Sequence, residues 1–153
     1  MPFRIRSASS DDATAMALVH VGSWRETYRG VVRDEVLDDP AMLERRIAFW
    51  RGALADPAHA ANRVAVAESD GRIRGIAMAG PGSPQQLHLL YTLRELHGTG
   101  AGGALLDAVL DPRAAELWVA ERNPRARAFY AKHGFTADGV SRGDETIEIR
   151  LAR

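Results

Sequence analysis

The chain of 153 residues contains no cysteine. This absence excludes disulfides, thiolate metal ligands and a cysteine nucleophile together. An excess of either charge is also missing, because lysine plus arginine and aspartate plus glutamate both number 20. No strong overall field is available to attract nucleic acid or an anionic membrane, so neither is expected as a partner.

Long apolar runs are absent as well. No stretch reaches the roughly eighteen apolar residues of a membrane-spanning helix, and no signal-like apolar segment stands at the start. Neither an internal repeat nor a low-complexity linker is visible. We therefore expect residues 1–153 to form a single cytoplasmic domain that is long enough to bury a substantial core.

The most informative stretch runs from Leu87 to Leu106. It reads as an apolar strand, a turn with four glycines in six residues, and the start of an amphipathic helix. The first amides of a helix lack internal partners and lie at the positive end of its dipole, and glycine lets a phosphate approach the backbone. The turn predicts a site for a phosphate-bearing ligand, although a purely structural glycine turn would have the same letters.

A dinucleotide is one candidate ligand. Gly98, Gly100 and Gly103 have the spacing of the nucleotide fingerprint, and they lie between a predicted strand and a predicted helix. The position argues against this ligand, because the fingerprint usually follows the first strand of a doubly wound sheet. Only 50 residues follow Gly103, too few for the remaining half of such a sheet.

Hydrophobic periodicity predicts the element order β, α, α, β, β, β, α, β, α, β, β. Alternating residues mark strands near 3–6, 63–68, 72–79, 87–92, 116–120, 135–140 and 146–151. Stripes spaced by three and four residues mark helices that begin near Ser9, Asp39, the glycine turn and Asn123. A meander followed by strands that alternate with helices favours an α+β fold with a mixed sheet.

Two separated motifs, together with this order, resemble the GCN5-related N-acetyltransferase (GNAT) superfamily over essentially the whole chain. The family's acyl-CoA loop reads Arg or Gln, x, x, Gly, x, Gly or Ala, and residues 97–102 are similar to it, with His97 in place of the usual first residue. The later motif resembles residues 123–135, Asn-Pro-Arg-Ala-Arg-Ala-Phe-Tyr-Ala-Lys-His-Gly-Phe. The resemblance implies a central mixed, mostly antiparallel sheet of about seven strands with about four helices, and an N-acetyltransferase that uses acetyl-CoA.

The resemblance assigns mainly backbone groups to the cofactor. Amides of the turn would hold the diphosphate of acetyl-CoA, and the preceding strand would pair with the pantetheine arm and polarise the thioester carbonyl. Asn123 would contact the pantetheine as well as cap its own helix. The cofactor-binding residues expected in this way are Leu90, Tyr91, Thr92, Gly98, Thr99, Gly100, Ala101, Gly102, Gly103 and Asn123, with no metal.

Tyr130 is the catalytic residue that the second motif implies. When an amine attacks a thioester, the sulfur departs as a thiolate, and a phenol of reference pKa about 10 can donate a proton to a thiol of about 8.5. Without the motif, a tyrosine packed beside Phe129 would be read as core. Because no cysteine and no serine in a nucleophile setting is present, direct transfer in a ternary complex is expected.

The sequence leaves the general base open. In the ribosomal-protein acetyltransferase branch a glutamate stands five residues before the motif asparagine, where this chain has Trp118. This difference argues against that branch's mechanism and its protein N-terminal substrate. Strand alternation places His88 on the same face as Leu90 and makes it a candidate, beside Glu26 and Glu121.

Residues 23–30 look like the early helix that covers the acceptor side in many bacterial members of the family, so Trp24 and Tyr28 are candidate substrate-binding residues. Aromatic residues on such a stripe, Trp50 included, are more often core, and His20 there usually just hydrogen-bonds. The acceptor is an amine on a small molecule or a peptide, and a homodimer is a candidate assembly because dimers are common in that family. A non-catalytic acyl-CoA sensor and a dinucleotide-binding protein remain as alternatives.

Overall fold

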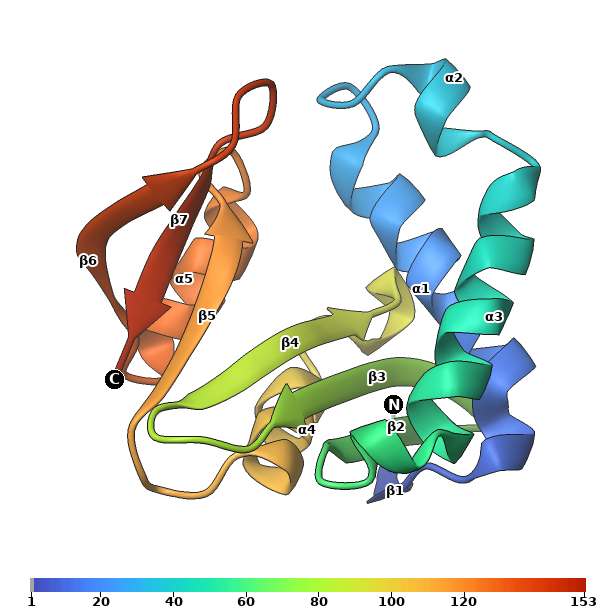
Figure 1. The fold of residues 1–153 in the computed structure, drawn as a ribbon. Coiled ribbons are helices and arrows are strands. Elements are labelled where there is room, and N and C mark those ends of the chain that lie inside the picture. Colours follow the sequence, from blue (N-terminus) through green and yellow to red (C-terminus); the bar gives the residue numbers. More distant parts are fainter. Residues whose placement is uncertain (1) are drawn as a thin grey trace.

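The computed structural model describes residues 2–153 and is built on one sheet of seven strands (Figure 1). The strands lie in the order β1-β2-β3-β4-β5-β7-β6 across the sheet. Every neighbouring pair is antiparallel except β4 and β5, which run parallel. This mixed, mostly antiparallel sheet confirms the predicted fold class and is not the doubly wound sheet of a dinucleotide-binding domain.

The observed elements follow the predicted order with one addition. The strands are β1 (Arg4–Ser7), β2 (Arg63–Ser69), β3 (Arg72–Gly80), β4 (Gln85–Thr92), β5 (Ala115–Ala120), β6 (Thr136–Arg142) and β7 (Glu148–Ala152). The helices are α1 (Ala13–Tyr28), α2 (Asp34–Leu37), α3 (Ala41–Ala55), α4 (Ala101–Val109) and α5 (Pro124–Lys132), with short 3-10 turns η1 (Ser10–Asp12), η2 (Pro57–His59) and η3 (Arg94–Leu96). The sequence did not predict α2, because its 4 residues are too few to show a helical period.

Local side-chain chemistry sets the ends of the main helices. The amide of Ala41 donates to the Asp39 carboxylate at 2.9 Å, and the amide of Ala126 donates to Oδ1 of Asn123 at 3.1 Å. Both bonds satisfy a free N–H in the first turn, so α3 and α5 begin where their caps predicted. The chain leaves α1 through Gly30, whose φ of +88° suits glycine.

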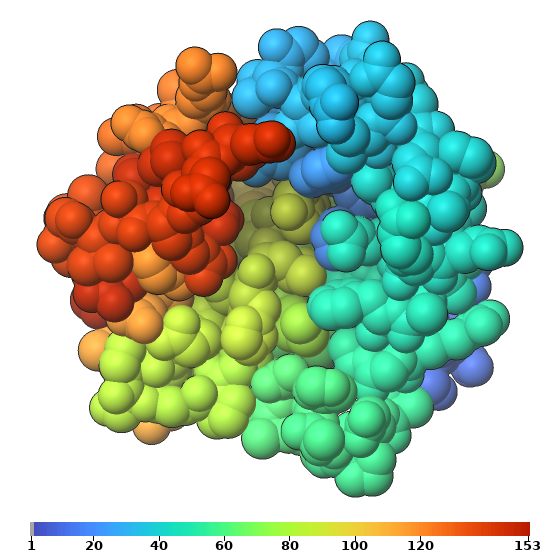
Figure 2. Space-filling model, turned by 45° about the horizontal axis from the view of Figure 1, so that its top comes forward, coloured from blue at the N-terminus to red at the C-terminus, as the bar shows by residue number. Residues whose placement is uncertain are grey.

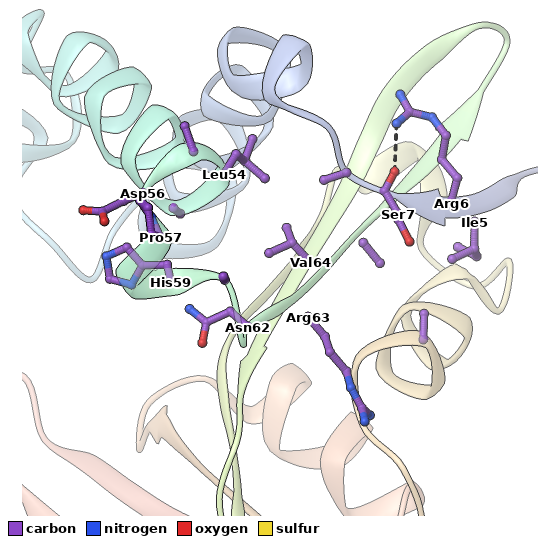
Figure 3. Close-up of a pocket in the computed structure, with 16 residues that line it drawn as sticks. Ile5, Arg6, Ser7, Leu54, Asp56, Pro57, His59, Asn62, Arg63 and Val64 are labelled. Atoms are coloured by element: carbon purple, nitrogen blue, oxygen red, sulfur yellow. Dashed lines mark hydrogen bonds between the residues drawn. The ribbon is translucent and has the colours of Figure 1, made fainter.

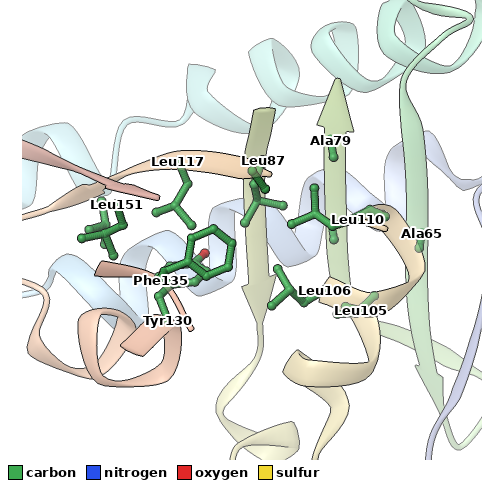
Figure 4. Packing of buried hydrophobic residues seen from close by; sticks show 14 of the residues in the cluster. Ala65, Ala79, Leu87, Leu105, Leu106, Leu110, Leu117, Tyr130, Phe135 and Leu151 are labelled. Atoms are coloured by element: carbon green, nitrogen blue, oxygen red, sulfur yellow. The ribbon is translucent and has the colours of Figure 1, made fainter. Parts of the chain in front are cut away.

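Helices cover both faces of the sheet. The pair α1 and α3 lies on one face, and α4 and α5 lie on the other (Figure 1). Figure 4 shows Leu87, Leu106 and Phe135 gathered between the sheet and the second pair, in a cluster of buried residues that continues to Leu151. On the first face Trp50 is completely buried, so its core interpretation is confirmed.

Strands β4 and β5 hold together only at their beginnings. Residues 85–87 pair with residues 115–117, whereas β3 pairs along β4 as far as Thr92. The amide of the buried Gln85 side chain donates to the carbonyls of Asp111 and Arg113 at 3.3 and 3.1 Å, and so holds the segment that leads into β5. Beyond this apex the two strands diverge (Figure 1), which leaves one edge of β4 without a partner strand.

A β-bulge at His88 corrects one prediction. Leu87 and Leu89 pair with consecutive residues of β3, so His88 is an extra residue in β4. Leu87 and Leu90 consequently pack in the same core cluster, while Leu89 packs in the cluster under α1 and α3. The prediction that His88 shares a face with Leu90 is wrong: a Cβ at Gly80, on the α3 face, would lie 2.6 Å from Nε2 of His88.

Candidate functional site

A cavity of about 910 Å³ lies where β4 and β5 separate. The end of β4, the glycine turn, the start of α4 and the helix α5 line it, and α1 contributes Glu26 and Thr27. The predicted site residues in its lining are Leu90, Tyr91, Thr92, Gly98, Gly100, Gly102, Gly103, Asn123 and Tyr130. The two motifs, residues 97–102 and 123–135, are therefore brought to one cavity.

Two residues of the turn have a structural position instead. The Thr99 hydroxyl donates to the carbonyl of Leu96 at 2.6 Å and accepts from the amide of Ala101 at 3.3 Å. Ala101 itself is completely buried. The Thr99 hydroxyl thus braces the turn that precedes α4, and the amide of Ala101 is already engaged within the protein.

The remaining amides of the turn are available to a ligand. Within residues 2–153, the amides of Gly98, Gly100, Gly102 and Gly103 have no hydrogen-bond partner. Gly98 and Gly100 have φ values of +78° and +89°, which an L-residue adopts only with strain. A Cβ at Gly102 would stand 3.0 Å from the ring of Phe129, so glycine also lets α4 approach α5 closely. Free amides at a helix start form an anion-binding site.

The charged side chains around the cavity favour the same kind of ligand. Four cationic residues and two carboxylates line it: Arg94, Arg122, Arg125, Lys132, Glu26 and Asp107. The whole chain is neutral, so this excess of positive charge is local to the cavity. A positive field in a concave site attracts phosphates.

His97 joins the turn to the end of β4. Its Nε2 lies 3.2 Å from the carbonyl oxygen of Thr92, and its Nδ1 is buried and has no partner within residues 2–153. Burial, followed by the positive charge of Arg125, lowers the pKa of the imidazole. A neutral ring whose Nε2–H donates to Thr92 is consistent with both observations. The histidine therefore supports the turn, a position that the family fills with arginine or glutamine.

Tyr130 lies at the inner end of the cavity. It is 7% exposed, and its ring packs against Phe129 and Phe135 at centroid distances of 5.2 and 5.8 Å. Its hydroxyl has no hydrogen-bond partner in the part of the chain that the structure describes. Burial, with smaller effects of Tyr91 and Tyr28, raises the pKa of Tyr130, so the phenol is protonated and can donate.

Asn123 connects the cavity to α1. Its Oδ1 caps α5 by accepting from the amide of Ala126. The Asn123 side chain also acts on Tyr28 of α1, where it lowers the pKa of the phenol against the larger effect of burial, which raises it.

Trp24 and Tyr28 do not line this cavity. They are one helical turn apart on α1, with ring centroids separated by 5.9 Å and tilted by 56°. Figure 2 shows this side of the molecule hollowed between the N-terminal helices (blue to teal) and the C-terminal strands (orange and red), with β4 residues (yellow-green) at the bottom. We call this concavity the hollow.

Of the three candidate bases, only Glu26 shares the cavity with Tyr130. Glu26 lines the cavity, but its carboxylate accepts from the amide of Arg94 at 3.0 Å. Glu121 is exposed and lies outside the lining, and His88 faces the α3 side near η2. A fourth carboxylate, that of Glu148 on β7, was not among these candidates. The sequence gives no signal for it, because it stands at a polar position of an alternating strand.

A second cavity, of about 700 Å³, lies at the opposite edge of the sheet beside β1, β2 and the end of α3 (Figure 3). In Figure 3, Arg63 extends away from Asp56 and His59. Arg6 is engaged by Asp12 at 2.8 Å. The polar groups of this second cavity therefore do not converge, and none of the predicted site residues lines the cavity.

Two further findings concern other classes of ligand and partner. Within residues 2–153, no three histidine, cysteine, aspartate or glutamate side chains gather in a way that could hold a metal ion. Over the same residues, no helix combines the length and the apolar character that crossing a bilayer requires.

The open β4–β5 junction and the glycine turn match a known class of enzyme. Residues 60–137, half of the chain, match the model of the acetyltransferase (GNAT) domain. The chain belongs to the GNAT family of N-acetyltransferases, as its two motifs predicted.

Individual relatives agree with this assignment. The chain is 30% identical over 149 residues to a probable N-acetyltransferase of Mycobacterium tuberculosis, with 89% of this chain and 81% of that protein covered. Its fold is similar to that of the PaiA N-acetyltransferase from Thermoplasma acidophilum in complex with coenzyme A, with a TM-score of 0.80, 20% identity and 98% of both chains covered. YncA from Salmonella typhimurium, solved with acetyl-CoA, has a TM-score of 0.70, 18% identity, and coverage of 100% of this chain and 94% of that chain.

Proposed function

We propose that this protein transfers the acetyl group of acetyl-CoA to a primary amine by direct attack in a ternary complex. The observation that carries the proposal is that the unpartnered hydroxyl of Tyr130 and the unpartnered amides of the glycine turn belong to one cavity. Such a cavity can bind a diphosphate at one end and act on a thioester at the other.

The cofactor fits the groups that the protein leaves unsatisfied. The diphosphate accepts from the amides of Gly98, Gly100, Gly102 and Gly103, and the pantetheine arm lies along the open edge of β4. Two structural neighbours that contain coenzyme A or acetyl-CoA support this choice of ligand. Asn123 lines the same cavity as the end of β4, and it contacts the arm while it caps α5.

Tyr130 acts on the leaving group. As the amine nitrogen bonds to the carbonyl carbon, the bond from carbon to sulfur breaks and negative charge develops on sulfur. The phenol, which burial keeps protonated, donates a hydrogen bond to that sulfur. Because a phenol in this environment is a weaker acid than a thiol, full proton transfer follows only when the amide nitrogen returns a proton to Tyr130.

Tyr130→Phe tests this function. We expect kcat, followed as thiol release with a panel of primary amines, to fall about 100-fold, because the hydrogen bond to sulfur is lost in the transition state. The Kd of acetyl-CoA, measured by calorimetry, should stay within about twofold, since the binding groups are backbone amides elsewhere. Unchanged thermal unfolding would show that the variant is folded.

The outcomes separate the alternatives. Full turnover by Tyr130→Phe would refute the role of the phenol. A wild-type protein that binds acetyl-CoA and acetylates no amine would support the sensor interpretation. Thermal stabilisation by NADH and none by coenzyme A would contradict the proposed cofactor.

A further inference from the structure

The wall of the hollow opposite α1 is one face of β5 and β7. Val119 and Ile149 pair in register and pack into the core cluster on the side of α4 and α5. Since neighbouring side chains alternate between the faces of a strand, the next pair, Ala120 and Glu148, points to the other side, toward the hollow. The small Ala120 leaves the carboxylate of Glu148 uncovered.

The charge of Glu148 acts on tyrosines from two other elements. Burial raises the pKa of Tyr28 on α1 and that of Tyr91 on β4, the latter to about 12, and the charge of Glu148 adds the smallest of the effects at each. The same two tyrosines contribute, after burial, to the raised pKa of Tyr130.

One carboxylate oxygen of Glu148 is available to a ligand. Its Oε1 accepts from Nε of Arg142 at 2.9 Å, while Oε2 has no hydrogen-bond partner within residues 2–153. The guanidinium of Arg142 also lies 4.1 Å from the ring centre of Trp118, which holds it in place. Both side chains of this ion pair are solvent-exposed, Arg142 at 53% and Glu148 at 36%, so the pair is weak and a second cation can share the carboxylate.

The surroundings narrow the kind of cation. Arg142 from β6 pairs with Glu148, and Arg150, two residues along the same face of β7, is engaged by Asp138 at 2.6 Å. The charge of Glu148 acts on Tyr28 from α1 and on Tyr91 from β4, and Arg46 from α3 also acts on Tyr91. Arg46 disfavours a second positive charge in the ligand. Trp24 and Tyr28, a half-buried ring pair on α1, suit an apolar or aromatic body in the acceptor.

Given the proposed transfer to an amine, we propose that Glu148 binds the ammonium group of the acceptor beside the hydroxyls of Tyr28 and Tyr91 and removes one proton from it before attack. The acceptor is a primary amine with one positive charge and an apolar or aromatic body. Its nitrogen then faces the cavity that contains Tyr130.

The protons balance in this scheme. The ammonium gives one proton to Glu148, which releases it to solvent, and the neutral nitrogen bonds to the thioester carbon. When the bond from carbon to sulfur breaks, the sulfur takes the proton of Tyr130, and Tyr130 recovers one from the amide nitrogen. The products are the N-acetylated amine, the free thiol of coenzyme A and one proton in solution.

Glu148 fits this role better than the bases considered from the sequence. Oε2 of Glu26 accepts from the amide of Arg94, and Glu26 lines the cavity that the cofactor is proposed to fill. The pKa of His88 is lowered by burial and then by His59 on η2, and none of the three tyrosines affects it. Glu148 is the carboxylate whose charge acts on two of the tyrosines at the opening.

A binding measurement tests the cation site without knowledge of the natural acceptor. The protein, saturated with coenzyme A, is titrated with 2-phenylethylammonium and with its neutral isostere 2-phenylethanol, and chemical shifts are followed by NMR. We expect the wild type to prefer the ammonium about tenfold and Glu148→Gln to bind both equally. Glu116→Gln, a matched change on the same face of β5, should retain the preference. Equal binding of the two probes by the wild type would overturn the proposal.

A pH profile tests the proton transfer. With the fastest amine of the panel, Glu148→Gln should lower kcat/KM about 100-fold near pH 7 and less than about tenfold near pH 10, where solvent deprotonates the amine. A deficit that is independent of pH would contradict the base role. Failure of the acetyltransferase proposal itself would look different, because coenzyme A would not bind or Tyr130→Phe would be fully active. Tyr130→Phe should also keep the ammonium preference.

Discussion

The two sides of the opening between β4 and β5 present different kinds of chemical group to a ligand. On the side of α4 and α5, the groups that can meet a ligand are mainly backbone amides from one continuous turn. On the side of α1 and α3, they are side chains from α1, β4 and β7, which are remote in the sequence. A site made of backbone amides suits a ligand that all relatives share, whereas a site made of side chains suits a ligand that differs between relatives.

The largest expected effect concerns the backbone site. Gly100→Val places a β-branched residue at φ +89°, so the turn must change shape and its amides lose their common direction. We expect the affinity for acetyl-CoA, measured by calorimetry, to fall about 100-fold. Gly71→Val is the matched control, because Gly71 has φ +72° in the distant turn between β2 and β3. It should lower stability comparably and leave the affinity unchanged, and equal affinity losses in both variants would break the comparison.

The next effect concerns His20, whose ring lies beside Tyr91 of the side-chain site, and it is a dependence of the folding stability on pH. His20 accepts from Nε1 of Trp50 at 3.2 Å through Nδ1, and its ring lies 4.9 Å from that of Tyr91. Burial, and then Arg46, lowers the pKa of His20 from 6.5 to about 4. The folded state therefore needs the neutral ring, and its stability is complete above the unfolded pKa and is lost as the pH falls toward the folded one.

This linkage predicts a loss of about 2 kcal/mol in the free energy of unfolding between about pH 7.5 and pH 5. His20→Gln, which keeps an acceptor for Trp50, should remove most of this slope in urea unfolding curves. His88 and His97, whose pKa values are also lowered but which are less buried, account for the remainder. An unchanged slope in the variant would assign the dependence elsewhere.

The smallest effect is a gain in stability outside both sites. Gly52 lies in α3 and has no atom within 4 Å of the position that a Cβ would take. Gly52→Ala should raise the free energy of unfolding by roughly 0.5–1 kcal/mol, because alanine loses less backbone entropy in a helix. Acetyl-CoA affinity and amine preference should not change, and a change in either would tie these sites to global stability.

The backbone side could be predicted from the sequence because its signals are local. Four glycines between a strand and a helix, and an asparagine before a proline, specify the turn and the cap of α5 within a few residues. The order of helices and strands along the chain could be predicted for the same reason, because hydrophobic periodicity is also a local signal. The family motifs then joined the two segments.

The side-chain side could not be predicted because it depends on contacts between distant elements. One inserted residue in β4 moved His88 to the opposite face, and strand alternation alone does not show a bulge. Glu148 alternates with Ile147 and Ile149 as any solvated strand residue would, and only the register of β7 against β5 shows which wall it belongs to. The use of Tyr28 likewise depends on its contact with Asn123, which lies 95 positions away.

The clamp at Gln85 has a consequence for how such enzymes diversify. Only three residue pairs join β4 to β5, and Gln85 anchors the loop at that apex without reaching the cavity. A change in the angle between β4 and β5 at this apex changes the separation of the two strands in proportion to the distance from the apex. Exchanges near this apex can therefore widen or narrow the mouth of the cavity, while the amides of the glycine turn keep their positions relative to one another because they belong to one continuous segment.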